Sequence, residues 1–148
     1  MRVAVLMGSP SDGEHMAPAV RMLERFGVEA DVRVVSAHRS PDELAAFARS
    51  ARDEGFSALI CGAGLAAHLA GAAAAHTTLP VIGVPLSGGA LSGLDALYST
   101  VQMPTGIPVA TVSIDGAANA AILAVEMLAV TDEKLAVQLA EFRAGGAR

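Results

Sequence analysis

The feature that most constrains this chain is the alternation of short, fully apolar runs with helix-length segments. The runs at 2–7 (RVAVLM), 57–61 (SALIC) and 81–85 (VIGVP) are apolar at almost every position. Such runs are typical of parallel strands that are covered on both faces. The segments at 30–35 (ADVRVV) and 108–114 (PVATVSI) bring the predicted strands to five.

The boundaries of the first helix are marked in the sequence. Ser11 and Glu14 have the capping-box spacing at its start, and Gly27 stands in the stop position after Phe26. Pro18 falls inside this helix and should bend it or mark an irregular first turn.

The second helix should begin after Ser40, with Pro41 at its first position and Glu43 three residues after the cap, and should end at Gly55. An alanine-rich helix follows the third strand. Two more helices are expected near the C-terminus, AANAAILAVEMLAV and the amphipathic DEKLAVQLAEFRA.

Strands that alternate with helices in this way predict βαβ units and a parallel sheet with right-handed crossovers. No composition shift divides the chain, so we expect one domain over residues 1–148. The predicted architecture is a three-layer αβα, flavodoxin-like, doubly wound parallel sheet. The C-terminal helix at about 132–144 is expected to pack on a neighbouring subunit.

Charge and cysteine content limit the possible partners. The net charge is −5 and the pI is near 5.2, which argues against nucleic acid. The single Cys61 excludes an intramolecular disulfide and favours a reduced, cytoplasmic setting. Residues 58–75 are long and apolar enough for a crude membrane-span test, but their glycines and His68 favour a buried strand, a turn and a helix.

Polar residues and glycines gather where the predicted strands end. They occur at 8–12 (GSPSD), at 36–39 (SAHR), at 62–68 (GAGLAAH) and from Pro85 onward. In open α/β sheets the ligand site lies beyond the carboxyl ends of the strands. We therefore expect these segments to form one site.

The GSPSD turn suits an anionic group held by backbone N–H donors at a helix start. Asp12 would repel a phosphate at contact, so a sugar diol is the better partner for its carboxylate. The alternative is that Ser11 and Asp12 only cap the helix. The turn lacks the lysine of a P-loop, which argues against a triphosphate.

Two of the four histidines lie at predicted strand ends. His38 stands beside Arg39, which makes it a candidate for proton transfer, and His68 is the second candidate. His15 and His76 are expected on the surface. No histidine pair has close ligand spacing, so the metal signal is weak.

Three other features have alternative interpretations. The spacing Gly62-x-Gly64-x-x-Ala67 matches a dinucleotide fingerprint, but no acidic residue follows at the distance that the ribose contact needs. Cys61 is either a nucleophile or a buried strand residue. The segment 94–110 is expected to be a loop with an apolar face, which either packs into the core or forms a subunit contact beside a neighbour's site.

The chain resembles the N5-carboxyaminoimidazole ribonucleotide mutases of purine synthesis along nearly its whole length. The matching motifs, in chain order, are MGSPSD, SAHRSP, AGLAAHLAG, PVIGVP, ALSGLDALYSTVQMPTGIPVATV and GAANAAILA. SAHR together with AAHL resembles the bacterial mutases. The related carboxylases, which use carbon dioxide directly, usually carry a lysine after the histidine and lack the AAHL loop.

The resemblance implies specific roles. His38 matches the catalytic histidine. The implied substrate-binding residues are Ser9, Ser11, Asp12, Ser36, Ala37, Arg39, Gly64, Ala66, His68 and Leu69. Arg39 would hold the phosphate, Asp12 the ribose diol, and the loop with His68 would cover the carboxylate. No metal and no cofactor are implied, and the partners are the ribonucleotide and further copies of the chain in an octamer.

Small departures from the family fall in or near the closing loop. Leu65 stands where many relatives have glycine, and Ala70 where many have proline. Gly88 and Gly89 replace bulkier residues. Two alternatives remain: an aminoimidazole ribonucleotide carboxylase that uses carbon dioxide directly, and a non-catalytic flavodoxin-like domain that binds phosphate or flavin.

Overall fold

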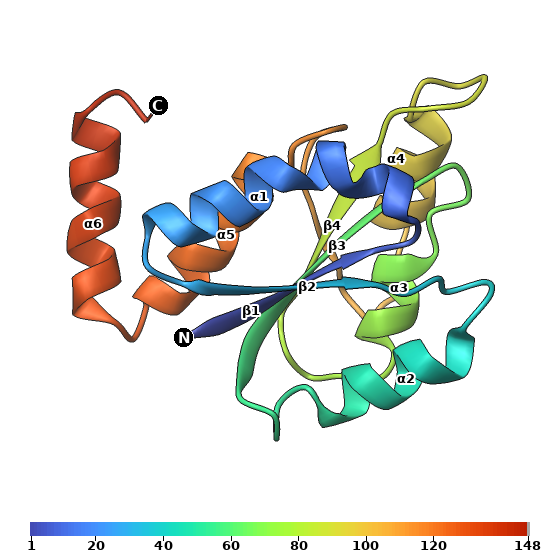
Figure 1. The fold of residues 1–148 in the computed structure, drawn as a ribbon, viewed down its shortest axis with the longest axis horizontal. Helices are drawn as coiled ribbons and strands as arrows, with labels where there is room; N and C mark the ends of the chain where they lie inside the picture. The colour runs from blue at the N-terminus through green and yellow to red at the C-terminus, as the bar shows by residue number, and fades with distance from the viewer. Residues whose placement is uncertain (148) are drawn as a thin grey trace.

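The computed structural model describes residues 1–147 and contains a parallel sheet between two layers of helices (Figure 1). The five strands are β1 Arg2–Met7, β2 Glu29–Val34, β3 Phe56–Gly64, β4 Val81–Leu86 and β5 Ala110–Thr111. Their order is β2-β1-β3-β4-β5, and each neighbouring pair is parallel. This is the flavodoxin-like order, so the predicted fold class is confirmed.

Helices cover both faces of the sheet. The elements are the 3-10 turn η1 Pro10–Asp12 and the helices α1 Gly13–Arg25, α2 Pro41–Ser50, α3 Leu69–Ala74, α4 Leu94–Val101, α5 Ala117–Ala129 and α6 Glu133–Ala144. Alternate residues of β1 point to opposite faces. Val3 and Val5 pack with α1 and α5, whereas Ala4 and Leu6 pack with α2 and α3. The sheet is therefore buried on both sides, as its apolar runs predict.

The register of the sheet aligns the carboxyl ends of the strands. Met7 pairs with Val34 on one side and with Gly62 on the other, and Gly64 pairs with Leu86. The loops after β1, β2, β3 and β4 consequently leave the sheet at the same edge. This alignment is what assembles the candidate site.

The helix α2 ends at Ser50, five residues before the predicted stop at Gly55. The Ser50 hydroxyl lies 3.2 Å from the carbonyl oxygens of both Ala46 and Phe47. A serine hydroxyl in this position competes with the backbone for helical acceptors. Residues 51–55 form turns, and Gly55 has a φ of +86°, so it closes the connection to β3 and not the helix itself.

The region before α5 also differs from the sequence prediction. The fifth strand covers only Ala110–Thr111 and not 108–114, although the Val112 amide still donates to the Gly83 carbonyl. Pro108 has no N–H to donate, which limits pairing on that side. Residues 94–101 form the helix α4, in place of the predicted loop, because Ala96 and Thr100 are buried against the sheet.

The C-terminal helix α6 lies at one end of the molecule, beside α5 (Figure 1). Its buried residues are Leu135, Leu139 and Phe142, and the Phe142 ring meets the Phe26 ring edge-on at 5.4 Å. Val137 on the same helix is exposed. The helix itself is confirmed, and its contact with a neighbouring subunit stays a prediction.

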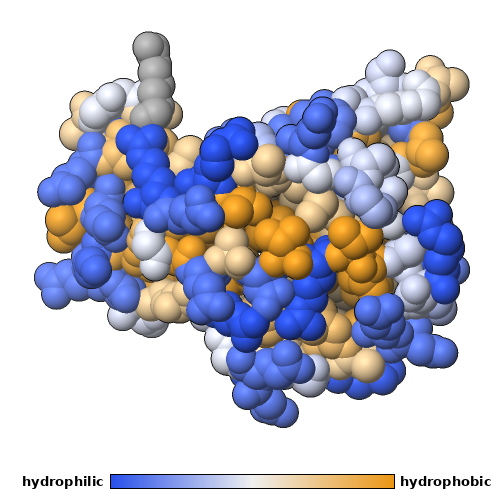
Figure 2. Space-filling model, viewed as in Figure 1, coloured by the Kyte–Doolittle hydropathy of each residue, from blue (hydrophilic) through white to orange (hydrophobic). Residues whose placement is uncertain are grey.

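The edge strand β2 exposes apolar side chains. Figure 2 shows hydrophobic residues in the middle of the face where β2 runs, with hydrophilic residues around them. Val32 and Val34 of this strand are 47% and 48% exposed. The outer strand is thus less covered than the inner strands.

Candidate active site

A cavity of about 660 Å³ opens at the carboxyl edge of the sheet. Its lining includes all eleven residues predicted for the site, Ser9, Ser11, Asp12, Ser36, Ala37, His38, Arg39, Gly64, Ala66, His68 and Leu69. These residues come from the three chain segments that follow β1, β2 and β3. The aligned strand ends bring them together, and their individual roles stay predictions.

The turn after β1 is built by a capping box that lies two residues earlier than predicted. Ser9 is the N-cap of η1, and its hydroxyl lies 2.9 Å from the Ser11 hydroxyl. Asp12 Oδ2 accepts a hydrogen bond of 3.0 Å from the Ser9 amide. The box is therefore Ser9 with Asp12, and not Ser11 with Glu14, because the 3-10 turn precedes α1. The capping box fixes the side chains of Ser9 and Asp12 at the cavity.

The turn after β2 presents Arg39 and His38. The Arg39 amide donates to Ser36 Oγ at 3.2 Å, and the Arg39 guanidinium donates through Nη2 to the Gly8 carbonyl at 3.1 Å. The guanidinium is thereby held over the end of β1. Ser40 is the N-cap residue of α2 as predicted, with Pro41 following, but its side chain makes no capping hydrogen bond.

His38 and His68 meet across the cavity. Nε2 of His38 lies 2.5 Å from Nδ1 of His68; the ring centroids are 4.8 Å apart and the ring planes are inclined by 81°. A hydrogen bond between two imidazoles requires that one nitrogen carries the proton and the other accepts it. Both side chains are exposed to the cavity, so the pair can exchange a proton with a bound ligand.

The loop after β3 carries His68 into the site. His68 is the N-cap residue of α3, and Leu69 behind it is buried. Leu65 has a φ of +54°, in the left-handed region that bulky residues rarely adopt, and its side chain is 57% exposed. The buried end of the loop anchors it, while its tip stands out at the cavity.

Eight further residues line the cavity; all except His15 lie in the segments that were expected to form the site, but none was named individually as a site residue. They are Gly8, His15, Ala63, Leu65, Leu86, Ser87, Gly88 and Gly89. His15 was expected only on the surface; it is exposed, but it also lines the cavity and lies 3.1 Å from Asp115 Oδ1. The predicted polar cluster from Pro85 onward was the one signal for the segment 87–89.

Cys61 is a buried strand residue and not a nucleophile. Burial raises the pKa of its thiol to about 12, so the thiolate is absent near neutral pH. Cys61 packs in the core between the sheet and the helices α2 and α3.

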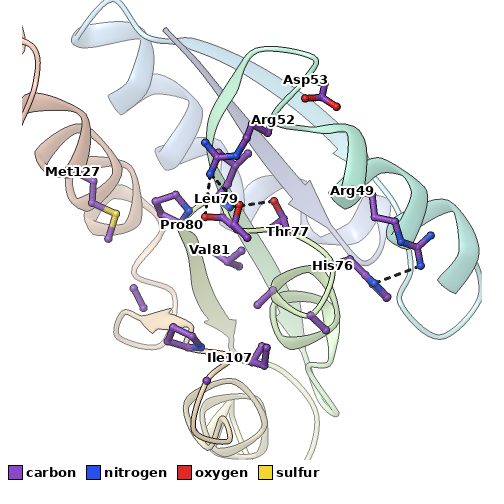
Figure 3. A pocket seen from close by; sticks show the side chains of 16 residues that line it. Arg49, Arg52, Asp53, His76, Thr77, Leu79, Pro80, Val81, Ile107 and Met127 are labelled. Carbon is purple, nitrogen blue, oxygen red and sulfur yellow. Dashed lines mark hydrogen bonds between the residues drawn. The ribbon is translucent and has the colours of Figure 1, made fainter.

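A larger cavity of about 870 Å³ lies at the opposite edge of the sheet, beside the starts of β4 and β5 (Figure 3). There the Arg52 guanidinium donates to the carbonyl and the hydroxyl of Thr78, and Arg49 contacts His76. These contacts join the end of α2 to the loop before β4. No residue predicted for the site lines this cavity, so we assign the site to the smaller one.

Residues 1–147 give no indication of a metal site or of a membrane span. No group of three or more His, Cys, Asp or Glu residues in this part of the chain is arranged to hold a metal ion. No helix among the same residues is long and apolar enough to span a membrane.

Known proteins match the chain closely. The profile of the AIR carboxylase family matches residues 2–148. An N5-carboxyaminoimidazole ribonucleotide mutase from Brucella melitensis is 57% identical over 95% of this chain and 88% of its own length. One from Escherichia coli is 53% identical over 96% and 85%.

A solved structure of a related protein has the same fold as this chain. The crystal structure of Treponema denticola PurE superposes with a TM-score of 0.87 at 28% identity, covering 99% of this chain and 91% of that one. Sequence and structure agree over nearly the full length, and the chain belongs to the AIR carboxylase family.

Proposed function

We propose that this chain is an N5-carboxyaminoimidazole ribonucleotide mutase. It moves the carboxylate from the exocyclic amine to ring carbon C4, which gives 4-carboxy-5-aminoimidazole ribonucleotide for purine synthesis. The observation that carries the proposal is identity above 50% with mutases over 95% or more of the chain. The cavity that contains every predicted site residue supports it.

Arg39 and Asp12 hold the two ends of the ribose phosphate. The Arg39 guanidinium binds the phosphate, because its fork of donors matches phosphate oxygens. The hydroxyls of Ser9, Ser11 and Ser36 lie in the same cavity and bind beside it. Asp12 Oδ2 accepts from the Ser9 amide, and Oδ1 is the oxygen that we assign to the ribose diol.

His38 carries the proton that the reaction moves. Loss of carbon dioxide breaks the bond between the carboxylate and the exocyclic nitrogen, which then gains a proton. Attack of C4 on the carbon dioxide forms the new carbon–carbon bond, and C4 loses a proton. The two proton transfers cancel, so one imidazole that first donates and then accepts is sufficient. The contact with His68 keeps a hydrogen-bond partner beside His38 throughout.

The loop of residues 65–68, which connects β3 to α3, closes the cavity during the reaction. Free carbon dioxide must stay beside C4, which requires a pocket that excludes water. The loop carries His68 to His38 and exposes Leu65 at its tip. Ala66 and Leu69 contribute the apolar lining around the carboxylate.

The enzyme works as a homo-oligomer, which we expect to be an octamer. Leu94, Tyr98 and Val101 follow each other at i, i+4 and i+7 on α4 and are 43% to 58% exposed. This stripe needs a partner surface, and another copy of the chain supplies it. Leu94→Asp should reduce the mass measured by light scattering; Val137→Asp tests the predicted subunit contact of α6 in the same way. An unchanged mass in both would refute these contacts.

The reaction takes place in the cytoplasm, where the other steps of nucleotide synthesis supply the substrate. The single cysteine, buried and without a disulfide partner, is compatible with that reduced compartment. Fractionation of cells that express the chain tests this directly.

The direct carboxylase is the second candidate, since the family as a whole is described by AIR carboxylase activity. The flavin-binding alternative is disfavoured, because no Phe, Tyr or Trp lines the described cavity and a flavin ring would have no stacking partner.

A two-substrate assay separates mutase from carboxylase. One reaction contains the N-carboxylated ribonucleotide alone, and the other contains aminoimidazole ribonucleotide with bicarbonate. A mutase forms the C4-carboxylated product rapidly in the first reaction. Fast turnover only in the second reaction would overturn the proposal in favour of the direct carboxylase, and turnover in neither would refute both.

A further inference from the structure

The segment 87–89 forms one wall of the candidate site, and its own sequence does little to hold it in place. It follows β4 and consists of Ser87, Gly88 and Gly89, all of which line the cavity. Gly89 has a φ of +61°. Two consecutive glycines have large backbone freedom, so a fixed wall at this point requires contacts from elsewhere.

Asp115 supplies these contacts. Its amide donates to the Pro85 carbonyl at 2.9 Å, and its Oδ1 accepts from the Ser87 amide at 2.9 Å. Asp115 has a φ of +56°, which aspartate tolerates better than most residues. Asp115, which lies beyond the last strand β5, is therefore hydrogen-bonded to Pro85 before the end of β4 and to Ser87 after it.

His15 joins the same carboxylate from α1. Its Nδ1 lies 3.1 Å from Asp115 Oδ1, the oxygen that also accepts from the Ser87 amide. Burial by itself raises the pKa of Asp115, but the hydrogen bonds with Ser87 and the neighbouring His15 outweigh it, so the pKa lies below its ordinary value. The carboxylate is thus ionised at neutral pH and accepts both donors.

The wall also meets the closing loop. A Cβ atom at position 89 would lie 2.6 Å from Leu65 Cδ2, so the side chain of Leu65 occupies the space that Gly89 leaves free. Leu65 precedes His68 in the loop, and His68 contacts His38. A displacement of the wall would therefore reach the histidine pair through the loop.

We propose that His15 and Asp115 are positioning residues, which hold the segment 87–89 as the fixed surface on which the Leu65 loop closes. The inference rests on the proposed mutase activity and extends it to residues with no role in the chemistry itself. With the wall held, carbon dioxide stays beside C4. With the wall released, part of the carbon dioxide escapes from the cavity, and the corresponding aminoimidazole ribonucleotide leaves the enzyme without being carboxylated again.

The test is the partition between the two products. Asp115→Ala removes the acceptor for both donors, whereas Asp115→Asn keeps an oxygen for the Ser87 amide and suits the left-handed backbone. We expect Asp115→Ala to lower kcat by about tenfold and to raise the ratio of released aminoimidazole ribonucleotide to carboxylated product several-fold, after subtraction of the spontaneous decarboxylation. Asp115→Asn should retain most of the wild-type ratio. Asp53→Ala, a change of an exposed aspartate beside the other cavity, is the control.

Hydrogen exchange provides a readout that is independent of catalysis. Asp115→Ala should speed exchange of the Ser87 amide while amides in β1 and β3 keep the wild-type rate. If the wild-type chain has no mutase activity but this local change occurs, the proposed function fails and the structural part of the inference stands. If exchange at Ser87 is unchanged, the positioning role is refuted.

Two further variants separate positioning from direct contact. His15→Ala should change the product ratio in the same direction as Asp115→Ala. If His15→Ala loses activity while Asp115→Ala stays normal, His15 acts on the substrate and the proposal is overturned.

Gly89→Ala should also raise the ratio of released to carboxylated product, and adding Leu65→Ala in a double variant should reverse part of that rise. Purely additive effects would contradict the seating of Leu65 on Gly89.

Discussion

His38 and His68 are thirty residues apart in the chain, and their ring nitrogens lie 2.5 Å apart in the fold. One residue follows β2, and the other precedes α3. Because the rings meet edge-on, each presents its nitrogen and not its face to the other. In the proposed mechanism His38 donates a proton and later takes one back, and between these two transfers its ring keeps His68 as a hydrogen-bond partner.

Replacement of His38 should remove the chemistry and spare binding. His38→Asn keeps a polar side chain but cannot transfer a proton, so we expect conversion to fall by at least about 100-fold. Binding of the ribonucleotide, measured by calorimetry, should stay within a few-fold of wild type. His76→Asn makes the same change beside the other cavity and should have no effect. Conversion that survives in His38→Asn would remove His38 from its assigned role.

Arg39 should act mainly on affinity. Arg39→Met removes the charge that we assign to the phosphate, and a charge-assisted hydrogen bond contributes about 1.5–3 kcal/mol. KM should therefore rise about 10- to 100-fold, with a smaller change in kcat. Arg52→Met, at the opposite edge of the sheet, is the matched control. Equal KM values for Arg39→Met and wild type would place the phosphate elsewhere.

Asp31 should make stability depend on pH. Arg33 Nε donates a hydrogen bond of 2.8 Å to Asp31 Oδ1, and this bond lowers the pKa of Asp31 below its ordinary value of 3.8. Burial opposes the shift, and the positive charges of Arg33 and Arg2 lower the pKa further. A lowered pKa in the folded state stabilises the protein above pH 3.8, and this contribution disappears as the pH falls through the folded-state pKa.

Asp31→Asn should therefore lower the free energy of unfolding by about 1 kcal/mol at pH 7, a value typical of a partly exposed ion pair. The difference should be smaller at pH 2 than at pH 7, because the stabilising contribution is lost as the carboxylate becomes protonated. Urea denaturation at both pH values and one protein concentration measures it, with the exposed Asp53→Asn as control. A difference that is the same at both pH values would show that the ionised carboxylate is not its source.

Gly83 should not tolerate a side chain. A Cβ at this position of β4 would overlap Thr100 Cγ2 and approach Val109 Cγ1 to 3.0 Å. Thr100 is buried, and its hydroxyl donates to the Ala96 carbonyl at 2.7 Å, so it cannot move aside freely. Gly83→Ala should reduce stability by about 1–3 kcal/mol in thermal or urea unfolding. Gly13→Ala, at a helical position with no atom near the new methyl, should cause no loss.

Local patterns were sufficient for most of the elements. The apolar run at 2–7 became β1 with the predicted bounds, and Ser40 with Pro41 marked the start of α2. The polar segments after the strands all reached one cavity, because parallel strands in one sheet must end at the same edge. The detailed list of site residues came from the resemblance to the mutases, which matched each motif in order.

By itself the sequence determined the parallel sheet, the edge that carries the site and the residues that gather there, since periodicity and capping act over a few neighbouring residues. Only the tertiary structure decided that α4 replaces a loop, that His38 meets His68, and that His15 pairs with Asp115 one hundred residues away. These outcomes depend on which side chains the folded sheet brings within hydrogen-bond distance. Such pairings have no period along the chain, and the packed core selects them.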